Sequence, residues 1–290
     1  MNIAILSRGS QLYSTQSLLR AGQRANHTME VLDPDCCKLL VENNKNILQY
    51  YDGFIDDLDA IVPRIGASRT YLGTSIVRHL EGMGVFPTVS SAAITASRDK
   101  WASFQLLVAH RVPVPKTVLC YNLEPESVVA EFNNKPVIIK LLRGTHGQGV
   151  ILTESPHNTI ATLQAMYACR QECIVQEYIA ESQGTDLRAI VVDGTVVAAM
   201  KRQSKIGEFR SNLHRGGSAV PIKLSAGEER VALLAARALK MGVCGVDILQ
   251  SERGPLVLEI NSTPGLEGVE KTTHVDVSKK IIHFIERNKS

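Results

Sequence analysis

Short apolar runs alternate with longer amphipathic stretches along the N-terminal third of the chain. The runs are short enough to be buried strands, and the stretches between them carry leucine and alanine at helical spacing. The predicted strands are Ile3–Leu6, Met29–Leu32, Ala60–Val62 and Val85–Phe86, and the predicted helices span 12–25 and 71–83. A strand, helix, strand order of this kind is typical of a small parallel sheet. We therefore predict an N-terminal α/β domain over residues 1–96.

Beyond residue 96 the apolar runs come in pairs separated by turn residues, a pattern that predicts antiparallel hairpins. The predicted strand pairs are 136–140 with 150–152, 187–192 with 196–200, and 246–249 with 256–260. The other predicted elements are a strand at 173–179 and helices at 101–110, 159–169, 226–241 and 275–287. A polar cluster after Ile179 is where a linker should run, so we predict a central domain over 97–182 and a C-terminal domain over 183–290. The predicted fold class is α/β (α+β).

The last predicted hairpin carries three oxygen-bearing side chains. If the chain reverses at Arg253, then Asp247 and Glu259 lie opposite each other on the two strands. Asn261 shares the face of Glu259 because strand side chains alternate. Opposed like charges destabilise a strand pair, whereas hard oxygen ligands that converge in this way suit one or two Mg²⁺ ions. A solvated hairpin face with unrelated acids is the alternative for the spacing alone.

A glycine-rich segment, residues 143–149, joins two predicted strands of the central domain. Its glycines, Gly144, Gly147 and Gly149, let backbone N–H groups approach phosphate oxygens. Because the segment links two strands, it is closer to a flap over nucleotide phosphates than to the Walker A or dinucleotide-binding patterns. Lys140 closes an apolar run just before it, where an ammonium needs an anionic partner such as phosphate. A flexible turn and a lysine that reaches solvent are the alternatives.

Several arginines occupy positions that favour anion binding. Arg64 and Arg69 follow the predicted strand at 60–62, at the carboxyl edge of the sheet, and are candidates for holding a carboxylate. The segment 201–217 is rich in cations and glycine, as are loops that surround a reacting phosphate or oxyanion. In both places, exposed loop arginines are the alternative.

Composition and charge narrow the class of protein. The chain has 290 residues, of which 44% are hydrophobic, enough for two or three compact units. A net charge of +3 is too small to indicate a nucleic-acid surface, and the six cysteines lack metal-binding spacing. No segment is apolar over the length of a membrane span, and the N-terminus lacks the features of a signal peptide. We expect a cytoplasmic protein with no membrane partner and no direct nucleic-acid partner.

In chain order, these features resemble the ATP-grasp superfamily: a strand lysine, a glycine-rich flap, a strand ending in Gln-Glu-Tyr, a basic loop and an Asp…Glu-x-Asn hairpin. Residues 97–100, 176–179, 209–217 and 259–268 resemble the RimK family in particular. RimK proteins are ligases that add glutamate to the C-terminus of a small-subunit ribosomal protein. The resemblance implies an ATP-grasp fold with an N-terminal pre-ATP-grasp domain, a central domain with the flap and a C-terminal domain with the metal hairpin.

The resemblance also implies roles for individual residues. The ATP phosphates would be bound by Lys100, Lys140 and the flap glycines, the adenine by Glu177 and Tyr178, and the ribose by Asp186. The phosphate end of the site would be lined by Arg210, Ser211 and Asn212. Two ions, Mg²⁺ or Mn²⁺, would be bound by Asp247, Glu259 and Asn261. The candidates to stabilise an acyl phosphate and the oxyanion that follows it are Arg188, Arg202 and Arg210.

Three functions remain open on the sequence. The first is a ligase that adds L-glutamate to the C-terminus of an acceptor protein, a small-subunit ribosomal protein in the RimK family. The second is an ATP-grasp ligase for a small-molecule or peptide acceptor, and the third is a non-catalytic nucleotide-binding regulator. His146 and Lys201 differ from the residues that RimK relatives often carry, which leaves the acceptor open. The family also implies a homo-oligomer.

Overall fold

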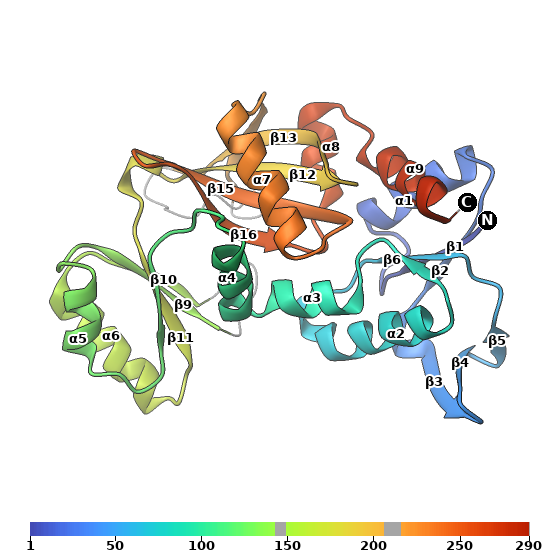
Figure 1. Ribbon diagram of the computed structural model, residues 1–290, viewed down its shortest axis with the longest axis horizontal. Coiled ribbons are helices and arrows are strands. Elements are labelled where there is room, and N and C mark those ends of the chain that lie inside the picture. The colour runs from blue at the N-terminus through green and yellow to red at the C-terminus, as the bar shows by residue number, and fades with distance from the viewer. Residues whose placement is uncertain (143–148, 206–215, 290) are drawn as a thin grey trace.

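The computed structural model describes residues 1–142, 149–205 and 216–289. The N-terminal domain contains a parallel sheet in the order β2-β1-β6-β7 (Figure 1). Its elements are β1 (Asn2–Leu6), α1 (Tyr13–Arg24), β2 (Thr28–Leu32), β6 (Ala60–Pro63), α2 (Thr70–Gly82) and β7 (Phe86–Pro87). The apolar side chains of β1 are fully buried, as expected for the central part of a parallel sheet covered by helices. The predicted parallel N-terminal sheet is confirmed.

A three-stranded antiparallel meander extends from this domain and was not predicted. Its strands are β3 (Cys37–Glu42), β4 (Lys45–Tyr50) and β5 (Gly53–Ile55). Asn43 and Asn44 form the tight turn between β3 and β4 and both have positive φ, 49° and 60°. Two positive φ angles at adjacent turn residues are the requirement of the commonest hairpin turn, and asparagine tolerates them better than most residues.

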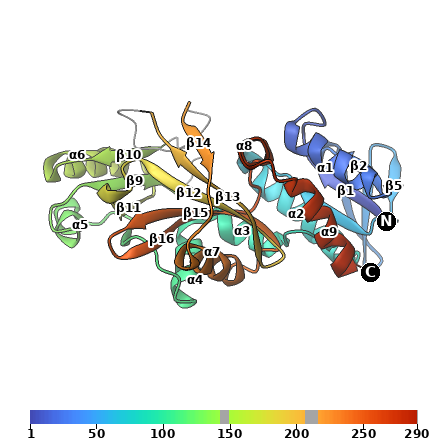
Figure 2. The same ribbon diagram turned by 90° about the horizontal axis from the view of Figure 1, so that it is seen from above.

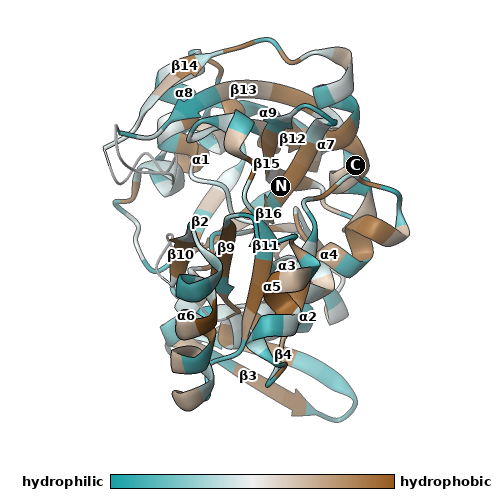
Figure 3. Cartoon of the chain, turned by 90° about the vertical axis from the view of Figure 1, so that its left-hand side faces the viewer, coloured by the Kyte–Doolittle hydropathy of each residue, from teal (hydrophilic) through white to brown (hydrophobic). Residues whose placement is uncertain are grey.

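The central domain is an antiparallel sheet in the order β10-β9-β11-β8 with two helices packed on it. Its elements are β8 (Thr117–Cys120), α5 (Pro125–Glu131), β9 (Val137–Leu141), β10 (Val150–Thr153), α6 (Pro156–Ala168) and β11 (Cys173–Glu177). A small separate core holds the helices to the sheet, with Val128, Phe132 and Leu163 against Ile139 and Val175. Figure 3 shows hydrophobic colouring along β9, β10 and β11. β8 and α5 had not been predicted.

The C-terminal domain contains a five-stranded antiparallel sheet in the order β14-β13-β12-β15-β16. Its strands are β12 (Thr185–Val192), β13 (Thr195–Gln203), β14 (Ser218–Pro221), β15 (Val243–Ser251) and β16 (Gly254–Asn261). The helix α7 (Ala226–Ala238) packs against this sheet and begins with a capping box, in which Ser225 and Glu228 exchange hydrogen bonds. β14 had not been predicted.

Four further helices connect these parts. They are α3 (Ser91–Arg98), α4 (Lys100–Ala109), α8 (Leu266–Thr273) and α9 (Val277–Lys289). α9 packs against α1, so the last described helix lies beside the first one (Figure 2). No helix in the described ranges has both the length and the apolar composition needed to cross a bilayer.

Candidate functional site

The β15–β16 hairpin places Asp247 and Glu259 opposite each other, as the sequence predicted. The predicted reversal at Arg253 is wrong, however, because Ser251 pairs with Gly254 and the turn is centred one half-residue earlier. Gly254 ends this turn with a φ of +99°, which glycine adopts without steric cost. The register then shifts between Asp247 and Ile248, where the opposite strand carries Leu258 as an extra residue. This β-bulge restores the opposition of the two carboxylates.

Asp247 lies at the centre of a buried charge network, and its side chain is 5% exposed. Its two oxygens accept hydrogen bonds from Arg188, at 2.7 Å from Nε and 2.6 Å from Nη2. The Nη2 atom of Arg202 lies 3.1 Å from Oδ2, and the amide of Asn261 donates to the same oxygen at 3.4 Å. Burial alone would raise the pKa of Asp247, but the two guanidinium charges outweigh it and lower that pKa. Four of the predicted site residues therefore meet here.

Arg202 joins this network to Asp186. Both side chains are 4% exposed, and Arg202 holds Asp186 through two hydrogen bonds, one of them 2.6 Å from Nε to Oδ1. Burial would lower the pKa of Arg202, but Asp247 and Asp186 raise it. Arg202 is thus a charge enclosed between two carboxylates. A role for Asp186 at the ribose stays a prediction, since both of its carboxylate oxygens accept hydrogen bonds from Arg202.

Two lysines from the other parts of the chain face the hairpin. Lys140 donates to Gln176 Oε1 at 2.6 Å, and Lys100 donates to the carbonyl of Leu142 at 3.0 Å. Burial lowers the pKa of Lys140 to about 8, against the opposing negative charge of Glu259. Glu259 is solvent accessible. Desolvation by the surrounding protein and the negative charge of Asp247 nevertheless raise its pKa, and they outweigh the opposing positive charges of both lysines. The predicted phosphate and metal residues are therefore brought together.

Glu177 and Tyr178 lie where the central sheet approaches the hairpin. Glu177 Oε1 accepts from the backbone N–H of Lys116 at 2.7 Å and from the guanidinium of Arg253. The Tyr178 N–H donates to the carbonyl of Pro136 at 3.3 Å. The contact with Arg253 connects the turn of the C-terminal hairpin to the end of β11. An adenine at these two residues stays a prediction.

Part of the predicted phosphate site can be described. Gly149 has a φ of +71°, and a Cβ at this position would lie 2.6 Å from Leu141 Cδ1, so the backbone requires glycine. β9 and β10 flank the glycine-rich segment as predicted, with Lys140 paired to Val150. The remaining predicted residues lie outside the described part of the chain: Gly144, Gly147, Arg210, Ser211 and Asn212.

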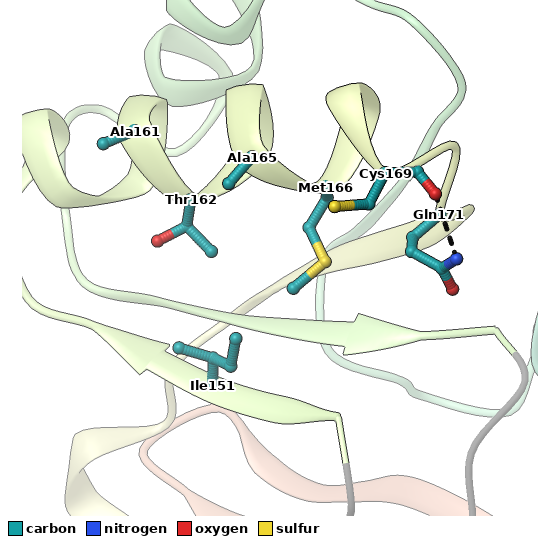
Figure 4. A pocket seen from close by; sticks show the side chains of 7 residues that line it. All are labelled: Ile151, Ala161, Thr162, Ala165, Met166, Cys169 and Gln171. Carbon is teal, nitrogen blue, oxygen red and sulfur yellow. Dashed lines mark hydrogen bonds between the residues drawn. The ribbon is translucent and has the colours of Figure 1, made fainter.

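An apolar hollow of the central domain is lined by none of these residues. It is lined by Ile151 of β10, the α6 residues Ala161, Thr162, Ala165 and Met166, and the adjoining Cys169 and Gln171 (Figure 4). Gln171 turns back to the carbonyl of Cys169 at 3.1 Å. The lining carries no charged side chain and none of the predicted site residues.

Family models cover almost the whole chain. A RimK-like ATP-grasp domain matches residues 97–285, and a RimK pre-ATP-grasp domain matches residues 1–94. The chain belongs to the RimK-like ATP-grasp family. This finding confirms the resemblance to the RimK family and the fold class predicted from the sequence. The prediction of an ATP-dependent ligase that forms C–N bonds is confirmed at the level of the family.

Relatives and solved structures agree with this assignment. The chain is 46% identical over 289 residues to a probable alpha-L-glutamate ligase of Thioalkalivibrio sulfidiphilus, covering 99% of this chain and 96% of the relative. A Vibrio vulnificus protein of the same description is 45% identical with the same coverage. The fold matches the ATP-grasp ligase PsnB in complex with a minimal precursor, with a TM-score of 0.77, 18% identity and coverage of 100% and 98%. A RimK domain protein of Sphaerobacter thermophilus matches with a TM-score of 0.73, 20% identity and coverage of 98% and 99%.

The ATP-grasp fold implies ATP and a divalent metal ion, and the hairpin fits such an ion. Asp247, Glu259 and Asn261 supply oxygen atoms from one face of one hairpin, and a cation would relieve the repulsion that raises the pKa of Glu259. In the described ranges, no group of three or more His, Cys, Asp or Glu side chains could hold a metal. Asn261 and the nucleotide phosphates would supply further oxygen ligands beside the two carboxylates. Among the described residues, Asp247 Oδ1 accepts a single hydrogen bond, from Arg188, and so keeps a lone pair for a cation.

Two features of the site were missed by sequence reasoning. Gln176 holds the ammonium of Lys140, although only its neighbours in the Gln-Glu-Tyr segment were assigned roles. The loop after Asn261 is contacted by Arg64 of the N-terminal domain, which donates to the carbonyl of Pro264, and by Arg98 at the end of α3, which lies near Thr263. The period-two pattern of a strand gives no signal for either contact, because both depend on how distant segments pack.

Proposed function

We propose that this protein uses ATP to add L-glutamate to the C-terminal carboxylate of an acceptor protein, with a small-subunit ribosomal protein as the acceptor. The observation that supports a ligase most directly is the meeting of the Asp247, Glu259 and Asn261 face with two lysines, Lys100 and Lys140. The relatives named as alpha-L-glutamate ligases support the amino acid. The peptide-bound PsnB and MdnC structures, which share the fold, support a peptide acceptor.

In the proposed reaction, the acceptor carboxylate attacks the γ-phosphate of ATP, and ADP leaves. The glutamate amine then attacks the acyl phosphate, and phosphate leaves as the amide forms. Lys140 remains mostly protonated at neutral pH, because its lowered pKa of about 8 is still above 7, and its charge suits the phosphates. Divalent ions bound by the hairpin, two in our proposal, would neutralise charge that develops on the phosphates.

The arginines in this proposal differ in how accessible they are. Arg188 is 17% exposed and Arg202 is 4% exposed. Arg188 is therefore better placed to reach an acyl phosphate or a tetrahedral oxyanion, while Arg202 orients Asp247 and Asp186. Arg210 is part of the same proposal and lies outside the described residues.

The rest of the proposal concerns the nucleotide-binding residues, the domains, the cellular location and the oligomeric state. We assign the adenine to Glu177 and Tyr178, the ribose to Asp186, and the phosphates to Gly144, Gly147, Gly149, Ser211 and Asn212 in addition to the two lysines. The three domains predicted from the sequence, the cytoplasmic location and the homo-oligomer belong to this proposal as well.

The test is an incubation of the full chain with ATP, Mg²⁺ and L-glutamate, with and without small-subunit ribosomal proteins. ADP release and the mass of each acceptor are measured. ADP and a mass increase by glutamate residues only with a ribosomal protein support the proposal. Glutamate transfer only to small molecules would move the acceptor to a different class, and no ADP under any condition would contradict a ligase.

A further inference from the structure

Arg64 connects the N-terminal sheet to the hairpin that carries the predicted metal ligands. It directly follows β6, at the carboxyl edge of the parallel sheet, where open α/β sheets bind ligands. Its backbone N–H donates to the carbonyl of Leu6 at 2.9 Å. Its Nη1 atom donates to the carbonyl of Pro264 at 2.8 Å. Pro264 comes three residues after Asn261, so the Cα atoms of these two residues are at most about 11 Å apart.

The guanidinium of Arg64 has no anionic partner within the described part of the chain. The bond to Pro264 is its one side-chain hydrogen bond there, and it forms no ion pair. Burial lowers the pKa of Arg64 to about 10. The negative charge of Glu270, which forms no ion pair with Arg64, opposes this shift. Glu270 is itself held by Ser17 Oγ at 2.9 Å and by the Ser278 N–H at 3.0 Å. A desolvated cation without a paired anion is unfavourable, which points to an anionic ligand.

The other two arginines near this edge of the sheet are already satisfied. Arg69 forms an exposed ion pair with Asp35 at 3.1 Å. Arg98 donates to the carbonyls of Gly66 and Ile65 and to the hydroxyl of Thr70. Arg98 is also partly buried and lies near Thr263, but its guanidinium makes several hydrogen bonds, whereas that of Arg64 makes one in the described part of the chain and can accept an anion.

We propose that Arg64 binds a carboxylate of the amino-acid substrate, which is L-glutamate in the proposed function on which this inference rests. The amine of glutamate reacts, so both of its carboxylates persist through the reaction and neither is neutralised by the chemistry. A guanidinium presents paired N–H donors that match a carboxylate. The bond from Arg64 to Pro264 holds the guanidinium beside the loop that follows the metal hairpin, three residues after Asn261. Arg64 would thus orient the amine toward the acyl phosphate.

Calorimetric titration of L-glutamate into the full chain, saturated with Mg²⁺ and a non-hydrolysable ATP analogue, tests this inference. Loss of a charge-assisted hydrogen-bond pair should weaken glutamate binding of Arg64→Met by about tenfold to a hundredfold. Arg64→Lys keeps the charge and should lie in between. Affinity for the ATP analogue should not change in either variant. Arg24, like Arg64, lies in the N-terminal domain, but it is exposed and pairs with Asp276 at 3.0 Å, so Arg24→Met should bind glutamate like the original protein.

Several outcomes would overturn the inference. Glutamate affinity equal to that of the original protein in Arg64→Met would do so while leaving the proposed function intact. A parallel loss of nucleotide affinity would show general disruption of the site instead. If the original protein binds the ATP analogue but not glutamate, both the inference and the choice of amino acid fail. If thermal unfolding shows that Arg64→Met does not fold, Arg64→Lys is the test, and a glutamate affinity equal to that of the original protein in this variant would overturn the inference.

Glutamine and glutamate α-amide identify which carboxylate is bound. The analogue that lacks the bound carboxylate should bind the original protein as weakly as glutamate binds Arg64→Met. The Arg64→Met variant should bind glutamate and that analogue with equal affinity. Equal binding of glutamate and both analogues by the original protein would mean that no carboxylate is recognised, and the inference would fall.

Discussion

Replacement of Lys140 by methionine should improve stability and impair nucleotide binding at the same time. Burial lowers the pKa of this lysine to about 8. The positive charge of Lys100 lowers it further, and the negative charge of Glu259 opposes both effects. The pKa of an unfolded lysine is about 10.4, so at 1.36 kcal/mol per pKa unit the charge costs the folded protein about 3 kcal/mol at neutral pH. Partial solvent access and the loss of the bond to Gln176 reduce the expected gain to about 1–2 kcal/mol.

The size of the stability gain depends on pH, and nucleotide binding should change in the unfavourable direction. Because the pKa of Lys140 is lower in the folded than in the unfolded chain, the cost is fully present below about pH 8 and fades as the pH rises toward about 10.4. Lys140→Met should therefore be more stable than the original protein at pH 7, and the difference should shrink at higher pH. Phosphate groups pair with the ammonium, so the variant should bind ATP at least about tenfold more weakly.

Urea unfolding without nucleotide, at pH 7 and at pH 9.5, measures the first effect, and calorimetric titration with an ATP analogue and Mg²⁺ measures the second. Lys135→Met, which removes an exposed lysine just before the same strand, is the matched control and should change neither quantity. A variant that is less stable than the original protein at pH 7 would refute the reasoning about the buried charge. A variant that binds the nucleotide normally would refute the assignment to the phosphates.

Three further predictions concern the hairpin and its neighbours. Glu259→Gln should abolish ADP release while leaving the thermal unfolding temperature equal or slightly higher, because it removes the repulsion opposite Asp247; retained turnover would remove Glu259 from the metal site. Arg202→Met should lower the free energy of unfolding, measured in urea, by about 3–5 kcal/mol, because it leaves two buried carboxylates without their shared partner; a loss below about 1 kcal/mol would contradict the enclosed network. Gly149→Ala should lower the same quantity by about 1–2 kcal/mol through its positive φ and the contact with Leu141, and Leu141→Ala in the same chain should recover part of that loss.

The facing carboxylates were predictable because a period-two pattern around a turn fixes which side chains share a face. The route to this arrangement was not predictable, since the turn lies half a residue from its expected centre and the bulge at Leu258 compensates. A bulge follows from local twist and hydrogen bonding, and apolar positions alone do not reveal it. The buried pairing of Arg202 with Asp186 likewise depends on strand register, which joins residues that are distant in the sequence.

The unpredicted meander at 37–55 has a different explanation. Its strands are partly exposed and mix charged with apolar residues, so the alternation that indicates a half-buried strand is weak. The turn residues Asn43 and Asn44 were the available signal, because adjacent asparagines tolerate two positive φ angles. β8 and β14 were missed because both are partly exposed edge strands, so neither shows the buried apolar run by which the strands of the N-terminal sheet were predicted.

The packing of α9 on α1 has a consequence for the order in which the chain can fold during its synthesis. Ile281, Ile282 and Ile285 of α9 belong to the same buried cluster as Leu18 of α1, although about 250 residues separate the two helices. When the first helix leaves the ribosome, the side chains that will cover it have not been translated. The N-terminal domain therefore stays partly uncovered until about 250 further residues have been translated and α9 can close its interior.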